Sequence, residues 1–209
     1  MIKNIFIFCL LPIAIIVFAY FLISGISDPV RFEQSKKHRE SVTIERLKDI
    51  RDVQVAYKSQ YGKFTASFDT LINFYNNGQL KIVRQIGSMD DSVAVARKLV
   101  SRDTSLVPVR ENVKLRSMRN SADSLRFVPF VGGEFEMEAV IKRVSGVDVP
   151  LFEARVPYDR LLAGLDRQLI VNINADVEAL NKNLATGKRY SGMKVGSIDQ
   201  PNNNAGNWE

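Results

Sequence analysis

The fold of this chain is decided first by residues 4–27, which read NIFIFCLLPIAIIVFAYFLISGIS. No residue in this stretch is charged, and residues 5–23 are almost continuously apolar. A helix of that length crosses the roughly 30 Å hydrocarbon layer of a membrane. The sequence therefore predicts a transmembrane anchor over residues 1–27.

The anchor is predicted to end at Asp28 and Pro29. A carboxylate is costly in lipid, and a proline disfavours helical geometry in the residue before it. We therefore expect a break here, followed by a juxtamembrane linker over residues 28–42. A cleaved signal peptide is the competing interpretation, because Lys3 supplies a basic start. Against it, the apolar stretch is longer than a usual signal core and no A-x-A-like site follows it.

The charges that flank the anchor do not fix its direction. Lys3 precedes the helix, whereas Arg31, Lys36, Lys37 and Arg39 follow it. Under the positive-inside rule this count places the domain in the cytoplasm. Lys36, Lys37 and Arg39 are then candidate contacts for lipid headgroups. A three-residue tail that carries a lysine is instead typical of an anchor whose N-terminus stays inside.

Composition limits the classes of site that the rest of the chain can hold. Residues 43–198 are long enough for one α+β domain, and residues 199–209 form a polar tail. The only cysteine, Cys9, lies in the anchor, and the only histidine is His38, so disulfides and Cys/His metal sites are excluded. The net charge is +6, but most basic residues are interspersed with acidic ones. No nucleic-acid partner is therefore expected.

Two helices are predicted after the linker. The first is capped by Ser41 or Thr43 and ends before Gly62. Its apolar residues fall within an arc of about 120°: Leu47, Ile50, Val53, Tyr57, Tyr61 and Phe64. The second is a short helix that starts at Thr65 or Ser67 and stops at Asn77 and Gly78.

Residues 45–71, ERLKDIRDVQVAYKSQYGKFTASFDTL, resemble a stretch of type II secretion pseudopilins and type IV pilins. In those proteins an N-terminal membrane helix is followed by a helix that ends in a Tyr-x-x-x-Tyr/Asn-Gly-x-Tyr/Phe pattern. A short helix and an antiparallel sheet come next. Here Tyr57, Tyr61, Gly62 and Phe64 occupy the positions of that pattern. The resemblance implies a pilin-like domain with a role in secretion or surface assembly.

The resemblance does not extend to the leader, which lacks the Gly/Ala-Phe-Thr-Leu-Ile-Glu processing site. Cleavage by a prepilin peptidase and the glutamate that pairs subunits in a fibre are therefore not carried over. The expected break at Asp28 and Pro29 also argues against packing into a pilus shaft. We expect a pilin-like domain on a membrane anchor rather than a fibre subunit.

The remaining pattern predicts an antiparallel sheet. A hairpin is expected from residues 134–142 and 147–154 around a turn at Ser145 and Gly146. Further strands are expected at residues 79–86, 100–113, 169–173 and 193–198, and short helices at 92–98, 158–165 and 176–180. The predicted fold class is α+β: an N-terminal transmembrane helix, then an amphipathic helix and a short helix packed on an antiparallel β-sheet.

Two groups of residues are candidate binding sites. The stripe of Tyr57, Tyr61 and Phe64 is either a core face or a partner-binding surface. Oxygen ligands gather in the tail, which offers a candidate calcium loop: Asp199, Asn202, Asn203 and Asn204. Major pseudopilins are similar in carrying a C-terminal calcium loop. This loop has a single carboxylate and lacks the EF-hand order, so we expect weak affinity for calcium.

No catalytic residue is predicted. A Ser-His-Asp site would need His38 beside the membrane, and the glycines at 132 and 133 lack the lysine of a P-loop. Two of the acids Glu134, Glu136, Glu138 and Asp148 could serve glycoside hydrolysis, but their alternation is typical of a solvated strand face.

We therefore expect a non-enzymatic envelope protein in a bacterial inner membrane, with its domain on the periplasmic side. It is expected to have protein partners, no small-molecule substrate and no cofactor other than the candidate calcium. The alternatives are a membrane-tethered hydrolase acting on glycans and a membrane adaptor that faces the cytoplasm.

Overall fold

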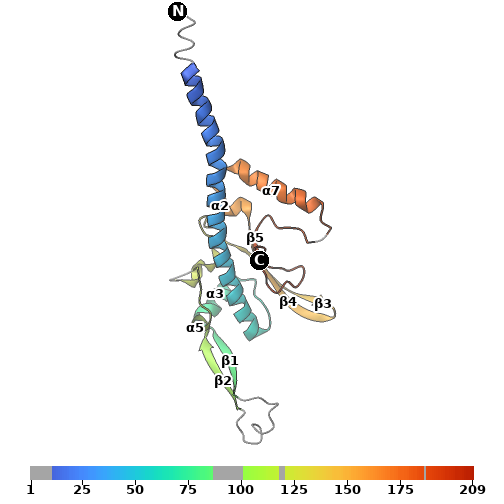
Figure 1. The fold of residues 1–209 in the computed structure, drawn as a ribbon. Helices are drawn as coiled ribbons and strands as arrows, with labels where there is room; N and C mark the ends of the chain where they lie inside the picture. The colour runs from blue at the N-terminus through green and yellow to red at the C-terminus, as the bar shows by residue number, and fades with distance from the viewer. Residues whose placement is uncertain (1–10, 87–100, 118–120, 186) are drawn as a thin grey trace, which may run out of the picture.

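A computed structural model describes residues 11–86, 101–117, 121–185 and 187–209. The fold is α+β, as predicted, with one long helix running past short helices and two small antiparallel sheets (Figure 1). The helices are α2 (Leu11–Tyr61), α3 (Phe68–Asn77), α5 (Val109–Asn112), the 3-10 helix η2 (Ala122–Arg126), α6 (Tyr158–Leu161) and α7 (Arg167–Lys182). The strands are β1 (Gln79–Ile86), β2 (Ser101–Pro108), β3 (Glu136–Val144), β4 (Val147–Pro157) and β5 (Gly192–Gly196).

The helix α2 is continuous over 51 residues, so the predicted break at Asp28 and Pro29 is wrong. A proline inside a helix removes one backbone hydrogen bond and costs about 3 kcal/mol. Pro29 leaves only one carbonyl, that of Gly25 four residues before it, without its helical donor. The other helical bonds continue on both sides. Residues 28–42 are therefore helix rather than linker, and the helix start predicted at Ser41 or Thr43 is also wrong.

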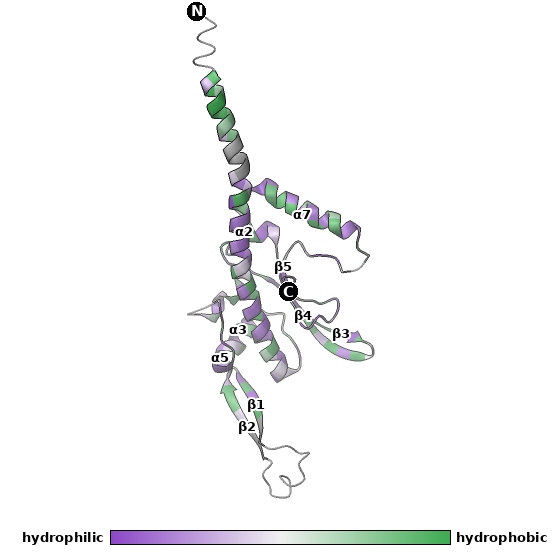
Figure 2. Ribbon diagram, in the orientation of Figure 1, coloured by the Kyte–Doolittle hydropathy of each residue, from purple (hydrophilic) through white to green (hydrophobic). Residues whose placement is uncertain are grey.

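The first part of α2 differs from the rest of the helix in hydropathy. Figure 2 colours its start as hydrophobic and most of its continuation along the body as hydrophilic. In the described parts of the chain, no helix combines the length and the apolar character needed to cross a membrane. The anchor predicted over residues 1–27 includes residues 1–10, which lie outside the described residues.

The second half of α2 is the centre of the core. Leu47, Ile50 and Val53 are fully buried, as the amphipathic pattern predicted. They belong to one apolar cluster with residues of α3 and of the sheet, including Phe152 and Val195. The short helix α3 is confirmed, and the side chain of Ser67 caps it by accepting a hydrogen bond from the Thr70 amide.

The strands form two sheets where one was expected. One is the ribbon β1–β2, and the other has the order β3–β4–β5. The predicted hairpin is confirmed as β3 and β4, and its turn residues Ser145 and Gly146 both have positive φ angles. The closing strand is confirmed as β5. The expected strand at residues 100–113 ends at Pro108, where α5 begins, and the expected helix at residues 92–98 lies outside the described residues.

The strand predicted at residues 169–173 is wrong, because these residues lie in α7. Leu169, Ile173 and Val177 also recur at helical spacing. The helical turn expected at residues 176–180 is part of the same helix. Asp166 starts the helix, since its carboxylate accepts a hydrogen bond from the Leu169 amide at 3.0 Å.

The C-terminal tail is docked on the body. Asn207 bonds to the start and the middle of β5: its side chain donates to the Gly192 carbonyl at 2.8 Å, and its backbone amide donates to the Lys194 carbonyl at 3.0 Å. Trp208 packs against the apolar core. A Cβ at Gly206 would lie 2.4 Å from the indole, so only glycine fits beneath this ring.

The docked tail should respond to acid. Arg51 donates to the Glu209 carboxylate at 2.7 Å, and this hydrogen bond lowers the pKa of Glu209 from its ordinary value. A lowered pKa contributes stability above the unfolded pKa, and that contribution is lost as pH falls through the folded pKa. Trp208 fluorescence, followed from neutral to acid pH, should report undocking as the pH falls below the ordinary pKa of a glutamate. Arg51→Gln should move the transition to higher pH, and an unchanged transition would contradict this role for Arg51.

A buried carboxylate fastens α2 to the segment before η2. Asp49 is fully buried and accepts hydrogen bonds from the backbone amides of Arg116 and Ser117, both at 2.8 Å. Asp49→Asn should destabilise the domain by about 1.5–3 kcal/mol, because a neutral amide cannot replace both oxygen acceptors. Asp52→Asn is the control, since Asp52 makes a partly exposed ion pair with Arg116 worth at most about 1 kcal/mol. Urea unfolding of the full chain in detergent compares them, and equal midpoints would contradict the role of Asp49.

Candidate functional site

A small aromatic groove lies between α2 and α3, with a volume of about 330 Å³. The residues that line it are Tyr57, Tyr61, Thr70, Asn73, Phe74, Asn77 and Gly78, and none of them is charged. The ring centroid of Tyr57 lies 4.6 Å from that of Tyr61 and 5.2 Å from that of Phe74. Tyr61 is 55% exposed, so the groove offers an accessible ring beside amide groups. This surface suits a neutral partner with both apolar and hydrogen-bonding groups.

The structure separates the three aromatic residues that the sequence singled out. Tyr57 and Tyr61 line the groove, but Phe64 is buried in the core with its ring centroid 4.7 Å from that of Phe152. Sequence reasoning missed the contribution of α3, where Asn77 donates to the Asn73 side chain at 2.7 Å. Their spacing of four residues on a predicted helix was the available signal.

The three basic residues proposed for lipid headgroups have different surroundings. Lys36 and Lys37 both pair with Glu33, at 3.5 and 3.8 Å. Arg39 instead donates to the backbone carbonyls of Leu161 and Ala163, at 3.0 and 2.9 Å. Arg39 therefore fastens α2 to the end of α6. Of the two lysines, Lys37 is the more exposed to solvent. The contact of these residues with lipid headgroups stays a prediction.

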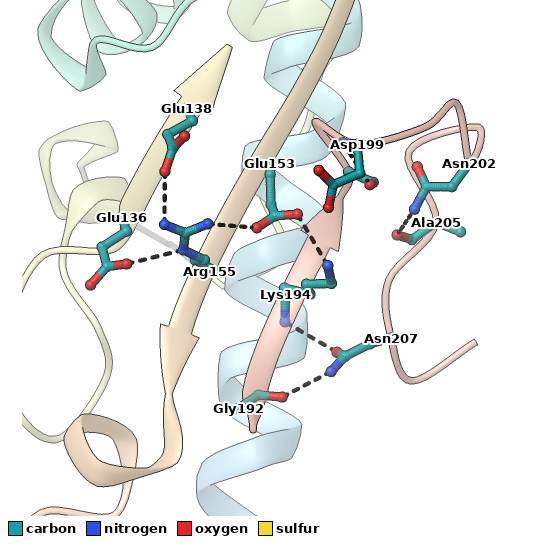
Figure 3. Close-up of polar contacts among 11 residues, drawn as sticks. Glu136, Glu138, Glu153, Arg155, Gly192, Lys194, Asp199, Asn202, Ala205 and Asn207 are labelled. Carbon is teal, nitrogen blue, oxygen red and sulfur yellow. Dashed lines mark hydrogen bonds and ion pairs between the residues drawn. The ribbon is translucent and has the colours of Figure 1, made fainter. Parts of the chain in front are cut away.

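The candidate calcium loop is held by hydrogen bonds of its own. Asn202 donates to the Ala205 carbonyl at 3.1 Å, as Figure 3 shows, and Lys142 donates to the Asp199 carbonyl at 2.8 Å. A bound cation would compete with the Lys142 ammonium for that oxygen. Among the described residues, no three His, Cys, Asp or Glu side chains gather closely enough to hold a metal ion. Calcium binding stays a prediction, and Asp199 is its one carboxylate.

An ion-pair network on the sheet was not foreseen from the sequence. Arg155 on β4 contacts Glu136, Glu138 and Glu153 at 3.0, 2.7 and 2.9 Å (Figure 3). The hydrogen bonds to Glu153 and then to Glu136 raise the pKa of Arg155 further. Glu153 is buried and is also paired with Lys194 on β5, at 3.1 Å. The network therefore ties the three strands together.

The network bears on the idea of a glycosidase pair. Glu136 and Glu138 both bond to one arginine, and Arg160 adds a second cation to Glu136 at 3.1 Å. Both acids are engaged in ion pairs, which leaves neither side chain free to contact a glycosidic oxygen. The arrangement favours a structural role for these acids. Glu136 lies opposite Arg155 because of the pairing between β3 and β4. Sequence reasoning missed the network because this register cannot be read from the sequence.

Comparisons with protein-family models, with curated proteins and with solved structures found no match for this chain.

Proposed function

We propose that this chain is a membrane-anchored envelope protein whose pilin-like domain is a component of a secretion or surface-assembly apparatus. The observation that carries the proposal is α2: an apolar, exposed first part runs without interruption into a second part that forms the core of the domain. The proposed anchor is residues 1–27, in a bacterial inner membrane.

The exposed side chains of α2 support the anchor. Ile13, Ile16 and Phe18 are 59%, 68% and 70% exposed, although they lie only a few residues apart on a helix. Successive residues of a helix point in directions 100° apart, so these side chains cover several sides of it. Leaving such side chains in water forgoes about 1.5–3 kcal/mol each, which lipid would supply. Residues 5–10, IFIFCL, continue the apolar character.

The order of the elements supports the likeness to pilins. A long N-terminal helix is followed by the short helix α3 and by antiparallel strands. Tyr57, Tyr61, Gly62 and Phe64 lie at the end of the long helix, where the resemblance requires them. A break at Pro29 would argue against packing of this helix into a pilus shaft. Because α2 continues through Pro29, that objection no longer applies.

We place the domain on the outer side of the membrane, where secretion and surface assembly occur, and assign the aromatic groove as its contact with a protein partner. A groove without charges needs no ion pairing, and its exposed Tyr61 is of the residue type enriched where proteins bind.

Deletion of the gene, followed by proteomics of the secreted and surface fractions, tests this function. We expect selected exported proteins to disappear from those fractions and to return when the wild-type gene is restored. Complementation with Tyr61→Ser should restore them only in part, whereas Ser59→Ala, a change at a nearby exposed position on α2, should restore them fully. Unchanged exported proteins in the deletion strain would contradict the proposal.

A further inference from the structure

A second pocket, with a volume of about 550 Å³, lies where the segment between α7 and β5 returns to the body of the domain. Figure 1 shows this segment running from the far end of α7 back to β5. The polar and charged residues that line the pocket come from segments far apart in the sequence: Tyr158, Lys188, Arg189, Tyr190, Lys194 and Asn207. Its volume lies within the range of about 300–1,000 Å³ that is typical of small-ligand pockets. We call it the basic pocket.

The lining of the basic pocket is cationic. Among the described residues that line it are three cations, Lys188, Arg189 and Lys194, and no carboxylate. Lys188 and Arg189 are exposed, and within the described parts of the chain their side chains form no ion pair or hydrogen bond. Two cations are therefore available to a ligand at one side of the pocket.

Two acids of α7 lie near the basic pocket without lining it. Asp176 and Glu178 flank Val177, which does line the pocket. Successive residues of a helix point in directions about 100° apart, so both acids are turned to the sides of Val177. Both are exposed, and Glu178 is paired with Lys182 at 3.4 Å. These acids leave the lining itself positive.

Tyr190 and Lys194 are held in fixed positions at the pocket. A Cβ at Gly192 would lie 2.8 Å from Cε1 of Tyr190, so the glycine lets this ring pack closely against β5. The Lys194 ammonium lies 6.0 Å from the centroid of the ring and 3.1 Å from the Glu153 carboxylate (Figure 3). Glu153 is also paired with Arg155 at 2.9 Å, so these three charged groups together keep a positive charge.

The segment that carries the two exposed cations is fastened to α7. The Asn181 side chain accepts a hydrogen bond from the Arg189 backbone amide at 2.7 Å and donates one to the Arg189 carbonyl at 2.8 Å. Gly187, with φ at +71°, makes the turn that precedes Lys188. The backbone beside the pocket is therefore fixed by two hydrogen bonds, which reduces the entropy lost when a ligand binds.

The hydroxyl of Tyr190 is a further donor at this site. Burial, above all, raises the pKa of Tyr190 to about 12, so the hydroxyl stays protonated at neutral pH. It forms no hydrogen bond with any other residue that the structure describes, whereas the Tyr158 hydroxyl donates to Glu40 at 2.7 Å. A free donor next to cations favours a ligand with several acceptor oxygens.

We propose that the basic pocket binds a small organic anion whose carboxylate or phosphate oxygens accept hydrogen bonds from Lys188, Arg189 and Tyr190. A guanidinium can donate two parallel hydrogen bonds to either kind of group, and such charge-assisted bonds are stronger than neutral ones. Lys194 adds positive charge at the β5 side of the pocket. The inference goes beyond the proposed function and does not depend on the membrane anchor.

Isothermal titration calorimetry of the full chain in a non-ionic detergent tests the proposal. Citrate is the carboxylate probe, glucose 6-phosphate is the phosphate probe, and glucose is the uncharged control. We expect saturable binding of at least one anion at millimolar concentration or below, and the anion that binds identifies the group that the pocket accepts. If neither anion binds, or if glucose binds as tightly as glucose 6-phosphate, the inference is wrong.

Charge-matched variants separate this pocket from general attraction to a basic protein. Replacing both Lys188 and Arg189 with glutamine should weaken binding of the anion by at least about tenfold. Replacing both Arg110 and Lys114 with glutamine also removes one exposed arginine and one exposed lysine, but should weaken binding by less than about twofold. Tyr190→Phe, which removes only a hydroxyl, should weaken binding several-fold. Equal losses in the two double variants would overturn the proposal, and circular dichroism verifies that each variant is folded.

Discussion

Replacing Ile16 with arginine should release the protein from the membrane fraction. Ile16 lies near the middle of the apolar stretch and is 68% exposed on α2. Exchanging an apolar residue for arginine at the centre of a membrane helix costs about 3 kcal/mol, which corresponds to roughly a hundredfold change in the insertion equilibrium. Carbonate extraction and immunoblotting of membrane and supernatant fractions measure the shift.

Val55→Arg is the matched control for that experiment. Val55 lies on the same helix and is 45% exposed, but it belongs to the part of α2 that carries the domain. We expect this variant to remain in the membrane fraction. If both variants stay bound, or if both are released, the apolar part of α2 is not what holds the protein.

Replacing Phe152 with alanine should be the most destabilising single change in the domain. Its side chain is 1% exposed and lies between the sheet and the core, in contact with Phe64. Removing a buried aromatic ring costs about 3–5 kcal/mol, because it leaves a cavity as well as lost contacts. For a domain of this size that amounts to roughly 10 °C in melting temperature.

Ile141→Ala is the control, because Ile141 lies on the neighbouring strand β3 and is 62% exposed. It should change the melting temperature by no more than about 2 °C. Circular dichroism of the full chain in detergent measures both variants. Equal melting temperatures would show that Phe152 does not hold the sheet to the core through its contact with Phe64.

Local signals allowed much of this fold to be predicted. The alternation of apolar residues and the Ser145–Gly146 turn gave the hairpin, and the helical spacing with Ser67 gave α3. Where a pattern fits two structures, it failed: Leu169, Val171 and Ile173 alternate as in a strand, but Leu169, Ile173 and Val177 also share one side of α7. A strand needs a partner, and sequence alone does not show whether one is near.

The error at Pro29 and the separation of Phe64 from Tyr57 and Tyr61 have distinct causes. Proline is a strong helix breaker, but a single missing hydrogen bond does not outweigh the packing of the long segment that follows. Phe64 was assigned to the aromatic stripe by continuing the helical pattern past Tyr61. Gly62, with φ at +73°, ends the helix there and redirects the chain, so Phe64 enters the core.

The candidate site was only partly foreseeable, because it depends on contacts between distant segments. The pattern of α2 identified Tyr57 and Tyr61, but the groove exists only because α3 folds back beside them. Likewise, the acids of β3 were visible as an alternating face, while their arginine is contributed by the next strand, 19 residues beyond Glu136. Pairings of this kind are set by tertiary structure rather than by local pattern.

Protease accessibility in intact spheroplasts tests the central claim most directly, because it reports both the anchor and the side on which the domain lies. Added protease should digest the domain in intact spheroplasts and leave a small membrane-embedded fragment, while a cytoplasmic marker stays whole. A domain that survives until the spheroplasts are lysed would place it in the cytoplasm and contradict the envelope function proposed for this protein.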